Sequence, residues 1–227
     1  MSVVDLEIES DYAFVTFLGK RQWGKSHAAR LYFDAYPFDR VVFDPNNDIA
    51  PEADWITIRR VPEDLATTGL EKREEALPLT SGTDPARVTV HYVPILSDPH
   101  WREDLDRLLL AVFEHQWVCL WIDEVVKVAK ANQTLPSMDL ILHQFAHQHL
   151  VVLLCGPRPV DIDPLVITQA DLLYLYRLRG VQDRRRLAEL LGVDLSELDV
   201  LMTLEPYNFL LHRDAFDDLV LMPPLPA

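Results

Sequence analysis

The sequence contains few cysteines, no long hydrophobic run and no excess of positive charge. Its 227 residues include two cysteines, Cys119 and Cys155, and both lie in apolar runs that predict core strands. We interpret them as small buried hydrophobic residues of a protein in a reducing cytoplasm. No apolar run approaches the roughly 20 residues that cross a bilayer, so we expect no membrane span. Residues 1–7 lack the basic flank and apolar stretch of a signal peptide.

Acidic residues outnumber basic ones, 36 to 21, which gives a formal net charge of −15. Proteins with a broad nucleic-acid-binding face are usually basic, so the composition argues against such a face. It does not exclude a ring-shaped motor, because a narrow pore needs only a few cations while the outer surface stays acidic. Hydrophobic residues make up 49% of the chain, enough for the core of one α/β domain.

The most informative stretch is G-K-R-Q-W-G-K-S at residues 19–26, the phosphate-binding P-loop pattern. An apolar run precedes it and a helical pattern follows it, which is the context that the motif needs. We expect Lys25 to reach the β- and γ-phosphates of a nucleotide and Ser26 to bind Mg²⁺. The alternative is a glycine-rich turn between a core strand and a surface helix. The predicted nucleotide-binding residues are Gly19, Lys20, Arg21, Gln22, Trp23, Gly24, Lys25, Ser26 and His27.

A second motif, Asp123-Glu124, follows an unbroken apolar run at residues 117–122. This is the Walker B pattern, in which a buried strand brings two carboxylates to the sheet edge beside the P-loop. We expect Asp123 to bind Mg²⁺ and Glu124 to act as the base that polarises the attacking water. An acidic cap at a strand end is the alternative interpretation. A water-activating base supports hydrolysis and is not needed by a simple kinase.

Strand and helix patterns alternate along the chain, which predicts a parallel sheet with helices on both faces. We expect one domain over residues 1–227, with a short Pro-rich tail at 222–227, an edge strand in residues 1–11, and a surface helix fragment plus loop between residues 63 and 87. Strands are predicted at residues 12–18, 40–43, 55–58, 88–93, 117–122, 150–155, 172–176 and 207–211, and helices at 26–36, 98–113, 137–147, 181–191 and 196–201.

Three arginines follow predicted strands at the same sheet edge: Arg158, Arg177 and Arg179. Any of them is a candidate arginine finger that stabilises γ-phosphate charge from a neighbouring subunit, although such an arginine taken alone is more often a surface residue or an ion-pair partner. Asp44 ends another predicted strand. It either touches the edge of the site or a neighbouring subunit, or it forms the turn before Pro45.

Two further groups of polar residues have an ordinary surface role as their favoured interpretation. The first group could bind a metal but has no fixed acidic or cysteine residue nearby as a further ligand. Its members are His143, His147 and His149. The second follows Walker B and could form a loop that reaches a DNA pore, and consists of Lys127, Lys130, Asn132 and Gln133.

The succession of motifs from about residue 12 to 191 resembles the HerA/FtsK superfamily of P-loop ATPases. Besides the P-loop and Walker B, residues 41–45 look like a family strand that ends in Asp-Pro, residues 156–163 resemble its T-Q-R-P sensor segment, and residues 183–185 resemble its D-x-R. Two features depart from the family. Pro157 stands where the sensor glutamine is expected, and Leu173 stands near the position of the arginine finger of FtsK-type translocases.

This resemblance implies a P-loop NTPase of the additional-strand, catalytic-glutamate type that uses ATP and Mg²⁺. The family contains hexameric motors that move double-stranded DNA through a ring pore, and a chain of this length is most similar to the genome-packaging ATPases of tailless, membrane-containing viruses. A homo-oligomer, a hexamer, is therefore expected, with a viral capsid or membrane vertex as a further partner and the host cytoplasm or virion as its location. The alternatives are an ATP-dependent switch or assembly protein with slow hydrolysis, and a small nucleotide kinase.

Overall fold

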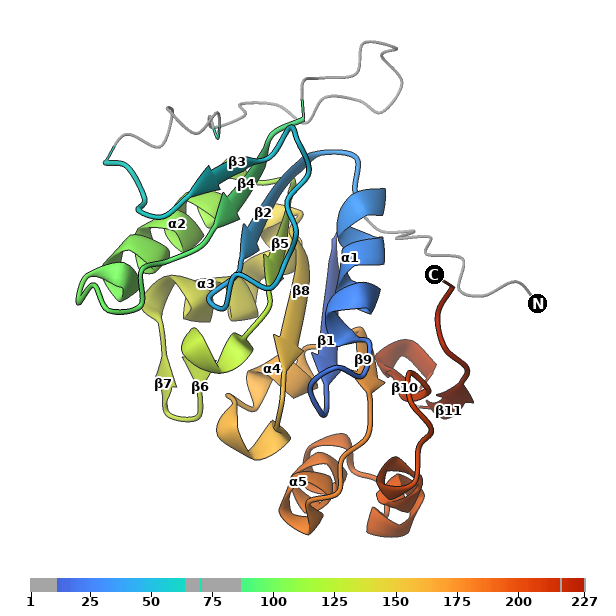
Figure 1. Ribbon diagram of the computed structural model, residues 1–227. Coiled ribbons are helices and arrows are strands. Elements are labelled where there is room, and N and C mark those ends of the chain that lie inside the picture. The colour runs from blue at the N-terminus through green and yellow to red at the C-terminus, as the bar shows by residue number, and fades with distance from the viewer. Residues whose placement is uncertain (1–11, 64–69, 71–86, 217, 227) are drawn as a thin grey trace.

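Nine strands form one sheet within the residues that the computed structural model describes, 12–63, 70, 87–216 and 218–226 (Figure 1). In sequence order they are β1 (Ala13–Leu18), β2 (Asp39–Phe43), β3 (Ile56–Ile58), β4 (Thr89–Tyr92), β5 (Val118–Ile122), β8 (Val151–Gly156), β9 (Leu172–Leu175), β10 (Phe209–Arg213) and β11 (Asp218–Met222). A separate hairpin pairs β6 (Ala129–Lys130) with β7 (Gln133–Thr134).

The order of strands across the sheet is β11-β10-β9-β1-β8-β5-β2-β4-β3. Every pairing from β9 to β3 is parallel, and only β10 and β11 pair antiparallel at one edge. The strand that leads into the P-loop, β1, and the Walker B strand, β5, are separated by β8. This confirms the expected additional strand between the two motifs. Because parallel strands end at the same edge, both motifs emerge at the carboxyl edge of the sheet.

Five α-helices occur among the described residues: α1 (Lys25–Ala35), α2 (Trp101–His115), α3 (Pro136–Gln144), α4 (Leu165–Thr168) and α5 (Val181–Leu191). Short 3-10 segments are η2 (Val125–Lys127), η3 (Phe145–Gln148), η4 (Pro159–Asp161), η5 (Leu195–Met202) and η6 (Asp214–Phe216). The first α-helix ends before Pro37, which cannot continue a helix. The last ends at Gly192, whose φ of 69° suits glycine at a helix C-cap.

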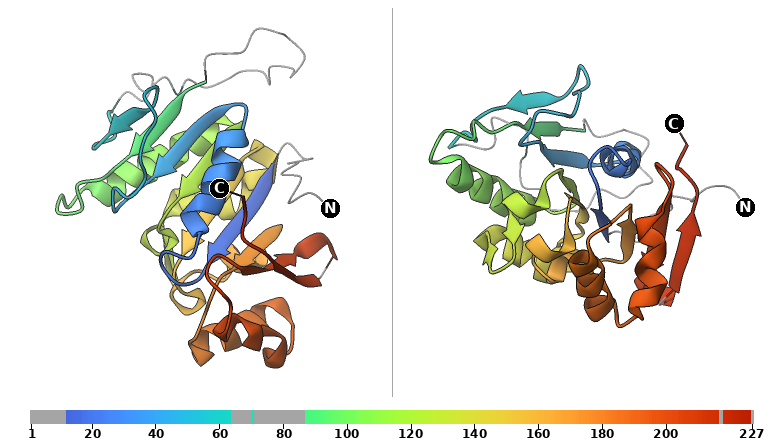
Figure 2. Two further views of the ribbon diagram at one scale, coloured as in Figure 1. Left: turned by 45° about the vertical axis from the view of Figure 1, so that its right-hand side comes forward. Right: turned by 60° about the horizontal axis from the view of Figure 1, so that its bottom comes forward.

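Alternating side chains of the strands pack against different helices. On β5, Trp121 meets Phe33 of α1, with ring centroids 5.5 Å apart. On β2, Phe43 stacks against Trp101 of α2, with ring centroids 6.4 Å apart. Two layers of helices therefore enclose the sheet, as two further views also show (Figure 2). All five residues of β5 are buried, which explains why this strand is an unbroken apolar run.

The predicted α/β class with a mainly parallel sheet is confirmed, and each predicted strand from residue 12 onward has a counterpart. Several features differ from the sequence predictions. Met222, predicted to lie in the tail, ends β11, which pairs with β10. The β6–β7 hairpin and α4 have no counterpart among the predicted elements, and the short helix predicted at 196–201 is the 3-10 segment η5. The expected strand in residues 1–11 and nearly all of the predicted segment 63–87 lie outside the described residues.

No helix within the described part of the chain has the length and apolar character needed to cross a membrane.

Candidate nucleotide site

The P-loop connects β1 to α1 in a conformation that requires its two glycines. Gly19 has a φ of 138°, and a Cβ atom there would lie 2.7 Å from the Cβ of Tyr176. Gly24, the residue before α1, has a φ of 99°, which also lies in the region that favours glycine. The loop therefore takes its shape from backbone angles and close packing that other residues tolerate poorly.

Lys25 opens α1 and lies at the bottom of the loop. Its Nζ atom donates hydrogen bonds to the carbonyl oxygens of Gly19 and Lys20, at 2.9 and 3.0 Å. Burial lowers the pKa of Lys25, and the nearby carboxylates of Asp123 and Glu124 partly counter this effect. The ammonium group is thus fixed in a partly dehydrated position, where its attraction for a phosphate is stronger than in water.

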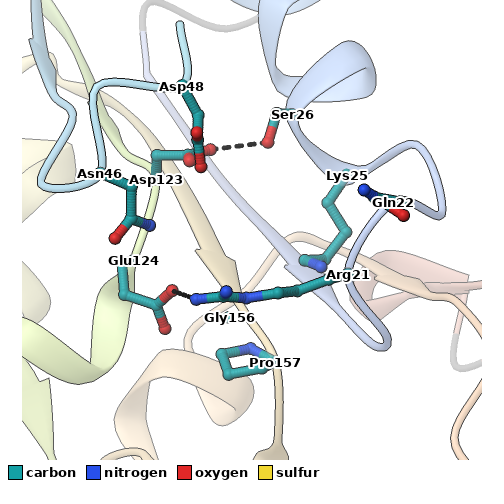
Figure 3. A pocket seen from close by; sticks show the side chains of 10 residues that line it. All are labelled: Arg21, Gln22, Lys25, Ser26, Asn46, Asp48, Asp123, Glu124, Gly156 and Pro157. Carbon is teal, nitrogen blue, oxygen red and sulfur yellow. Dashed lines mark hydrogen bonds and ion pairs between the residues drawn. The ribbon is translucent and has the colours of Figure 1, made fainter.

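A cavity of about 500 Å³ lies at the carboxyl edge of the sheet beside this lysine. Its lining comes from the P-loop and α1, from the loop after β2, and from the ends of β5 and β8. The lining residues, all labelled in Figure 3, are Arg21, Gln22, Lys25, Ser26, Asn46, Asp48, Asp123, Glu124, Gly156 and Pro157. The fold therefore brings the P-loop, the Walker B pair and the start of the sensor-like segment to one cavity, as their order along the chain predicted.

Ser26 and Asp123 lie side by side in the lining of this cavity. The hydroxyl of Ser26 donates a hydrogen bond of 2.7 Å to Oδ1 of Asp123 (Figure 3). Burial raises the pKa of Asp123 to about 6, and the negative charges of Asp44 and Glu124 add to this rise. The hydrogen bond from Ser26 and the charge of Lys25 act in the opposite direction. A buried carboxylate with a raised pKa has a strong affinity for a positive partner.

The residues present fit a bound Mg²⁺ ion. Ser26 Oγ and the Asp123 carboxylate are hard oxygen ligands on the same side of the cavity. Among the described residues, no group of three or more His, Cys, Asp or Glu side chains could hold a metal ion by itself. Magnesium sites commonly use one or two carboxylates and complete their shell with phosphate oxygens and water. The donor set therefore suits an ion that arrives with a nucleotide.

Glu124 lines the same cavity on the wall opposite the P-loop, and 9% of the residue is exposed. Arg21 extends from the P-loop toward it, with Nη2 3.7 Å from a carboxylate oxygen of Glu124 (Figure 3). The carboxylate is thus placed to accept a proton from a water molecule within the cavity.

Asp44 holds the loop after β2, and the structure supports its interpretation as a turn-forming residue. Its buried carboxylate accepts hydrogen bonds from the backbone N–H groups of Asp48 and Ile49, at 3.1 and 2.9 Å, and pairs with His91 Nε2 at 3.2 Å. Burial alone would raise the pKa of Asp44, but these hydrogen bonds outweigh it and lower the pKa below the ordinary value. The side chain does not line the cavity; it positions a loop whose residues do.

Sequence reasoning missed two residues that line the cavity, Asn46 and Asp48. Both belong to the Asp-Pro-Asn-Asn-Asp turn that follows β2. The available signal was this polar turn at the carboxyl end of a strand, since ligands in α/β sheets bind at that edge. Its distance from the P-loop depends on which strands become neighbours, and the local pattern does not encode that.

None of the three candidate finger arginines lines the cavity of its own chain. Arg158 donates to the carboxylate of Asp183 at 3.3 Å, which links the sensor-like segment to the D-x-R segment. Arg177 donates to the carbonyl of Met202 at 3.0 Å. The side chain of Arg179 is exposed and makes no hydrogen bond or ion pair within the described part of the chain. An action of any of them on a nucleotide would thus involve a neighbouring subunit.

Trp23, the unusual residue of the P-loop, packs within its own chain. It is 8% exposed. The guanidinium of Arg177 lies over its ring, 5.3 Å from the ring centroid, and Nζ of Lys20 lies 6.0 Å from the same centroid. His27, the last predicted nucleotide-binding residue, is exposed and its Nε2 lies 2.9 Å from the carbonyl oxygen of Pro226. The end of the chain therefore reaches the first turn of α1 (Figure 2).

Two of the three histidines considered as metal ligands, His143 and His149, have ordinary structural partners. His149 stacks on Trp117 with ring centroids 4.3 Å apart, and His143 lies 2.8 Å from the carbonyl of Asp139. Of the polar residues after Walker B, Lys127 ends η2, whereas Lys130, Asn132 and Gln133 belong to the β6–β7 hairpin, which emerges at the carboxyl edge of the sheet (Figure 1). Lys130, at its turn, is exposed.

No family model matches this sequence, and no curated protein does. This chain is similar to the solved structure of the genome packaging NTPase B204 from Sulfolobus turreted icosahedral virus 2 in complex with AMP. The two align with a TM-score of 0.69 and 20% sequence identity, over 95% of this chain and 100% of that chain. In complex with ATP-gammaS, the same NTPase has a TM-score of 0.68 at 20% identity, covering 95% and 98%. The DNA-packaging ATPase B204 from Sulfolobus Turreted Icosahedral Virus has a TM-score of 0.64 at 20% identity, covering 96% and 100%.

At this level of identity the comparison bears on architecture, because one fold can host different functions. The resemblance to the minimal viral packaging ATPases is confirmed for the fold: this chain has the P-loop NTPase fold of those proteins over nearly its whole length.

Proposed function

We propose that this protein is an ATPase whose hydrolysis drives double-stranded DNA through a ring, as in viral genome packaging. One observation carries the proposal: the P-loop residues Lys25 and Ser26 and the Walker B residues Asp123 and Glu124 line a single cavity. Phosphate-binding and water-activating groups on facing walls are the requirements for hydrolysis of a nucleoside triphosphate.

The nucleotide phosphates bind in the P-loop, where backbone N–H groups and the N-terminus of α1 favour negative charge. Lys25 contacts the β- and γ-phosphates. Ser26 and Asp123 would hold the accompanying Mg²⁺, which would neutralise charge on the phosphate oxygens. The raised pKa of Asp123 falls when a cation binds, because the positive charge favours the ionised carboxylate.

Hydrolysis follows at the Glu124 wall. A water oxygen attacks the γ-phosphorus, the bond from that phosphorus to the β-phosphate bridging oxygen breaks, and Glu124 accepts the water proton. The products are ADP and inorganic phosphate. Lys25 stabilises the charge on the leaving ADP from the opposite wall.

The motor part of the proposal rests on the fold likeness. The similar structures are described as genome packaging NTPases and a DNA-packaging ATPase, and one contains ATP-gammaS. By analogy, this chain forms a homo-oligomeric ring, a hexamer, at a capsid or membrane vertex in the host cytoplasm or virion. The exposed β6–β7 hairpin with Lys130 is the candidate DNA contact in the pore, since an acidic protein with a net charge of −15 needs only local cations there.

An arginine from a neighbouring subunit would complete the site in such a ring. Arg179 suits this role best among the three candidates, because it is exposed and has no partner in the described part of its own chain. Arg158 and Arg177 would have to give up hydrogen bonds to Asp183 and Met202.

A nucleotide-dependent switch with slow hydrolysis is the second candidate. Pro157 favours it, because this residue lines the cavity at the position expected for a sensor glutamine and its side chain has no hydrogen-bonding group.

The test is steady-state ATP hydrolysis by the full-length chain with and without linear duplex DNA, together with its mass in solution. We expect an oligomer whose hydrolysis rate increases with DNA, and no turnover in Lys25→Ala at unchanged thermal stability. Hydrolysis that ignores DNA in a strictly monomeric protein would contradict the motor and favour the switch.

A further inference from the structure

We infer that Asn46 is a further catalytic residue that, together with Glu124, orients the γ-phosphate and its attacking water. This inference rests on the proposed ATP hydrolysis. Asn46 lines the cavity from the loop after β2, a part of the chain that neither nucleotide-binding motif contains. Its primary amide carries both donors and an acceptor, so one side chain can donate to a phosphate oxygen and accept from a water molecule.

The turn that carries Asn46 is built around a buried anchor. The carboxylate of Asp44 accepts the N–H groups of Asp48 and Ile49, and the Asp44 carbonyl accepts the N–H of Asn47 at 3.4 Å. The anchor is itself held by His91, whose Nδ1 lies 3.3 Å from the Thr57 hydroxyl on β3. These bonds fix the backbone of the turn, so that the exposed side chain of Asn46 starts from a defined place at the edge of the cavity.

Sheet pairing places Asn46 beside Glu124. Phe43 of β2 and Ile122 of β5 are register partners, and the N–H of Asp123 continues the ladder with a 3.1 Å hydrogen bond to the carbonyl of Phe43. Asn46 and Glu124 therefore follow adjacent strands by a few residues. Figure 3 shows both on one side of the cavity, across from Lys25, with the guanidinium of Arg21 reaching Glu124. A γ-phosphate contacted by Lys25 would point toward this pair.

The guanidinium of Arg21 also reaches this side of the cavity, but it has donors only and is paired with Glu124. The remaining groups here cannot supply the same contacts. The side of Gly156 and Pro157 offers no side-chain hydrogen-bonding group. Asp48 carries a negative charge that repels a phosphate, and Figure 3 shows it beside the Ser26–Asp123 pair. The other amide in the cavity, Gln22, comes from the P-loop on the opposite wall. Asn46 is thus the lining residue suited to hold a water against the γ-phosphate near Glu124.

The test compares Asn46→Ala and Asn46→Asp with Asn47→Gly, in the full-length protein. Asn47 is an exposed neighbour that does not line the cavity, and its φ of 57° suits glycine. We expect Asn46→Ala to lower kcat by about 10- to 100-fold, with the Kd for ATP-gammaS changed less than about threefold. Asn46→Asp should be at least as slow, because it keeps the shape but loses the donors and adds a negative charge. Asn47→Gly should stay within about twofold of the original kcat.

Three results contradict the inference, and they differ in what else they affect. An Asn46→Ala variant with unchanged kcat overturns the role of Asn46 alone. So does a variant in which kcat and ATP-gammaS affinity fall together with thermal stability, since that indicates a structural role. An unmodified protein that binds ATP-gammaS but hydrolyses no ATP overturns the proposed function, and this inference with it.

Discussion

Asp44 and Asp123 follow the ends of the neighbouring strands β2 and β5, yet their carboxylates have opposite electrostatic situations. Asp44 receives hydrogen bonds from His91 and two backbone N–H groups, and its pKa lies below the ordinary value. Asp123 receives one hydrogen bond, from Ser26, and burial raises its pKa to about 6. Both are aspartates at the carboxyl edge of one sheet, so the difference comes from their surroundings and not from residue type or position.

This difference separates a structural carboxylate from a functional one. The protein itself compensates the charge of Asp44, which then fixes the turn that carries Asn46 and Asp48. It leaves the charge of Asp123 largely uncompensated beside a cavity that suits phosphate and Mg²⁺. Perturbed ionisation of this kind concentrates at functional sites, because stability alone would favour a satisfied group.

Removing the anchor should produce the larger loss of stability. Asp44→Ala leaves the buried N–H group of Ile49, the partly buried N–H group of Asp48 and the ring of His91 without their acceptor, so we expect the free energy of unfolding at pH 7 to fall by about 3 kcal/mol. Because the pKa of Asp44 is lowered in the fold, this contribution is present above its unfolded value and is lost as pH falls through the folded pKa. Urea denaturation at several pH values measures both effects.

The matched control for Asp44→Ala is Asp48→Ala, on the same turn but with an exposed side chain. Its stability should change by less than about 0.5 kcal/mol. Equal losses in the two variants would show that the turn is not anchored by Asp44.

Neutralising the functional carboxylate of Asp123 should increase the free energy of unfolding, whereas removing Asp44 decreases it. Asp123→Asn keeps an oxygen for the Ser26 hydroxyl and removes a buried charge, so we expect the free energy of unfolding at pH 8 to rise by up to about 2 kcal/mol. The carboxyl pKa is 3.8 ordinarily and about 6 in the fold, so protonation favours the folded state. The gain in the variant is therefore full above pH 6, shrinks as pH falls from 6 to 3.8, and vanishes below that.

ATP turnover should fall in this variant although its stability rises, because Asn cannot replace the carboxylate as a strong Mg²⁺ ligand. We expect a loss of Mg²⁺-dependent ATP turnover of at least about 100-fold. Asp54→Asn, which removes an exposed charge far along the loop after β2, should change neither property. A destabilised Asp123→Asn variant at pH 8 would mean that its charge is compensated within the protein.

The two carboxylates also show what could be predicted from the sequence. Asp123 follows an unbroken apolar run, so the local pattern predicts its place at the sheet edge, while its predicted role in Mg²⁺ binding depends also on the presence of the P-loop. Two interpretations of Asp44 remain open from the sequence, because its partner His91, which also contacts Thr57, belongs to a strand that the chain reaches later. Asn46 was missed for the same reason, since its place beside Glu124 depends on β2 pairing with β5.

The remaining differences have similar causes. The strand β11 alternates weakly and gains its identity by pairing with β10. The partners of Arg158 and Arg177 are distant in the chain, at Asp183 and Met202, so no local signal could tell an engaged arginine from a free one. Local motifs thus predicted the P-loop and Walker B, whereas long-range pairing determined the walls around them.

The central claim is that Glu124 activates the water that hydrolyses ATP in this cavity. It is tested most directly by single-turnover ATP hydrolysis in Glu124→Gln, measured alongside ATP-gammaS binding and thermal stability. We expect hydrolysis to fall by at least about 1,000-fold while nucleotide binding and folding stay intact, since the amide keeps the shape of the side chain but cannot accept the proton. Hydrolysis at the original rate in this variant would contradict the claim.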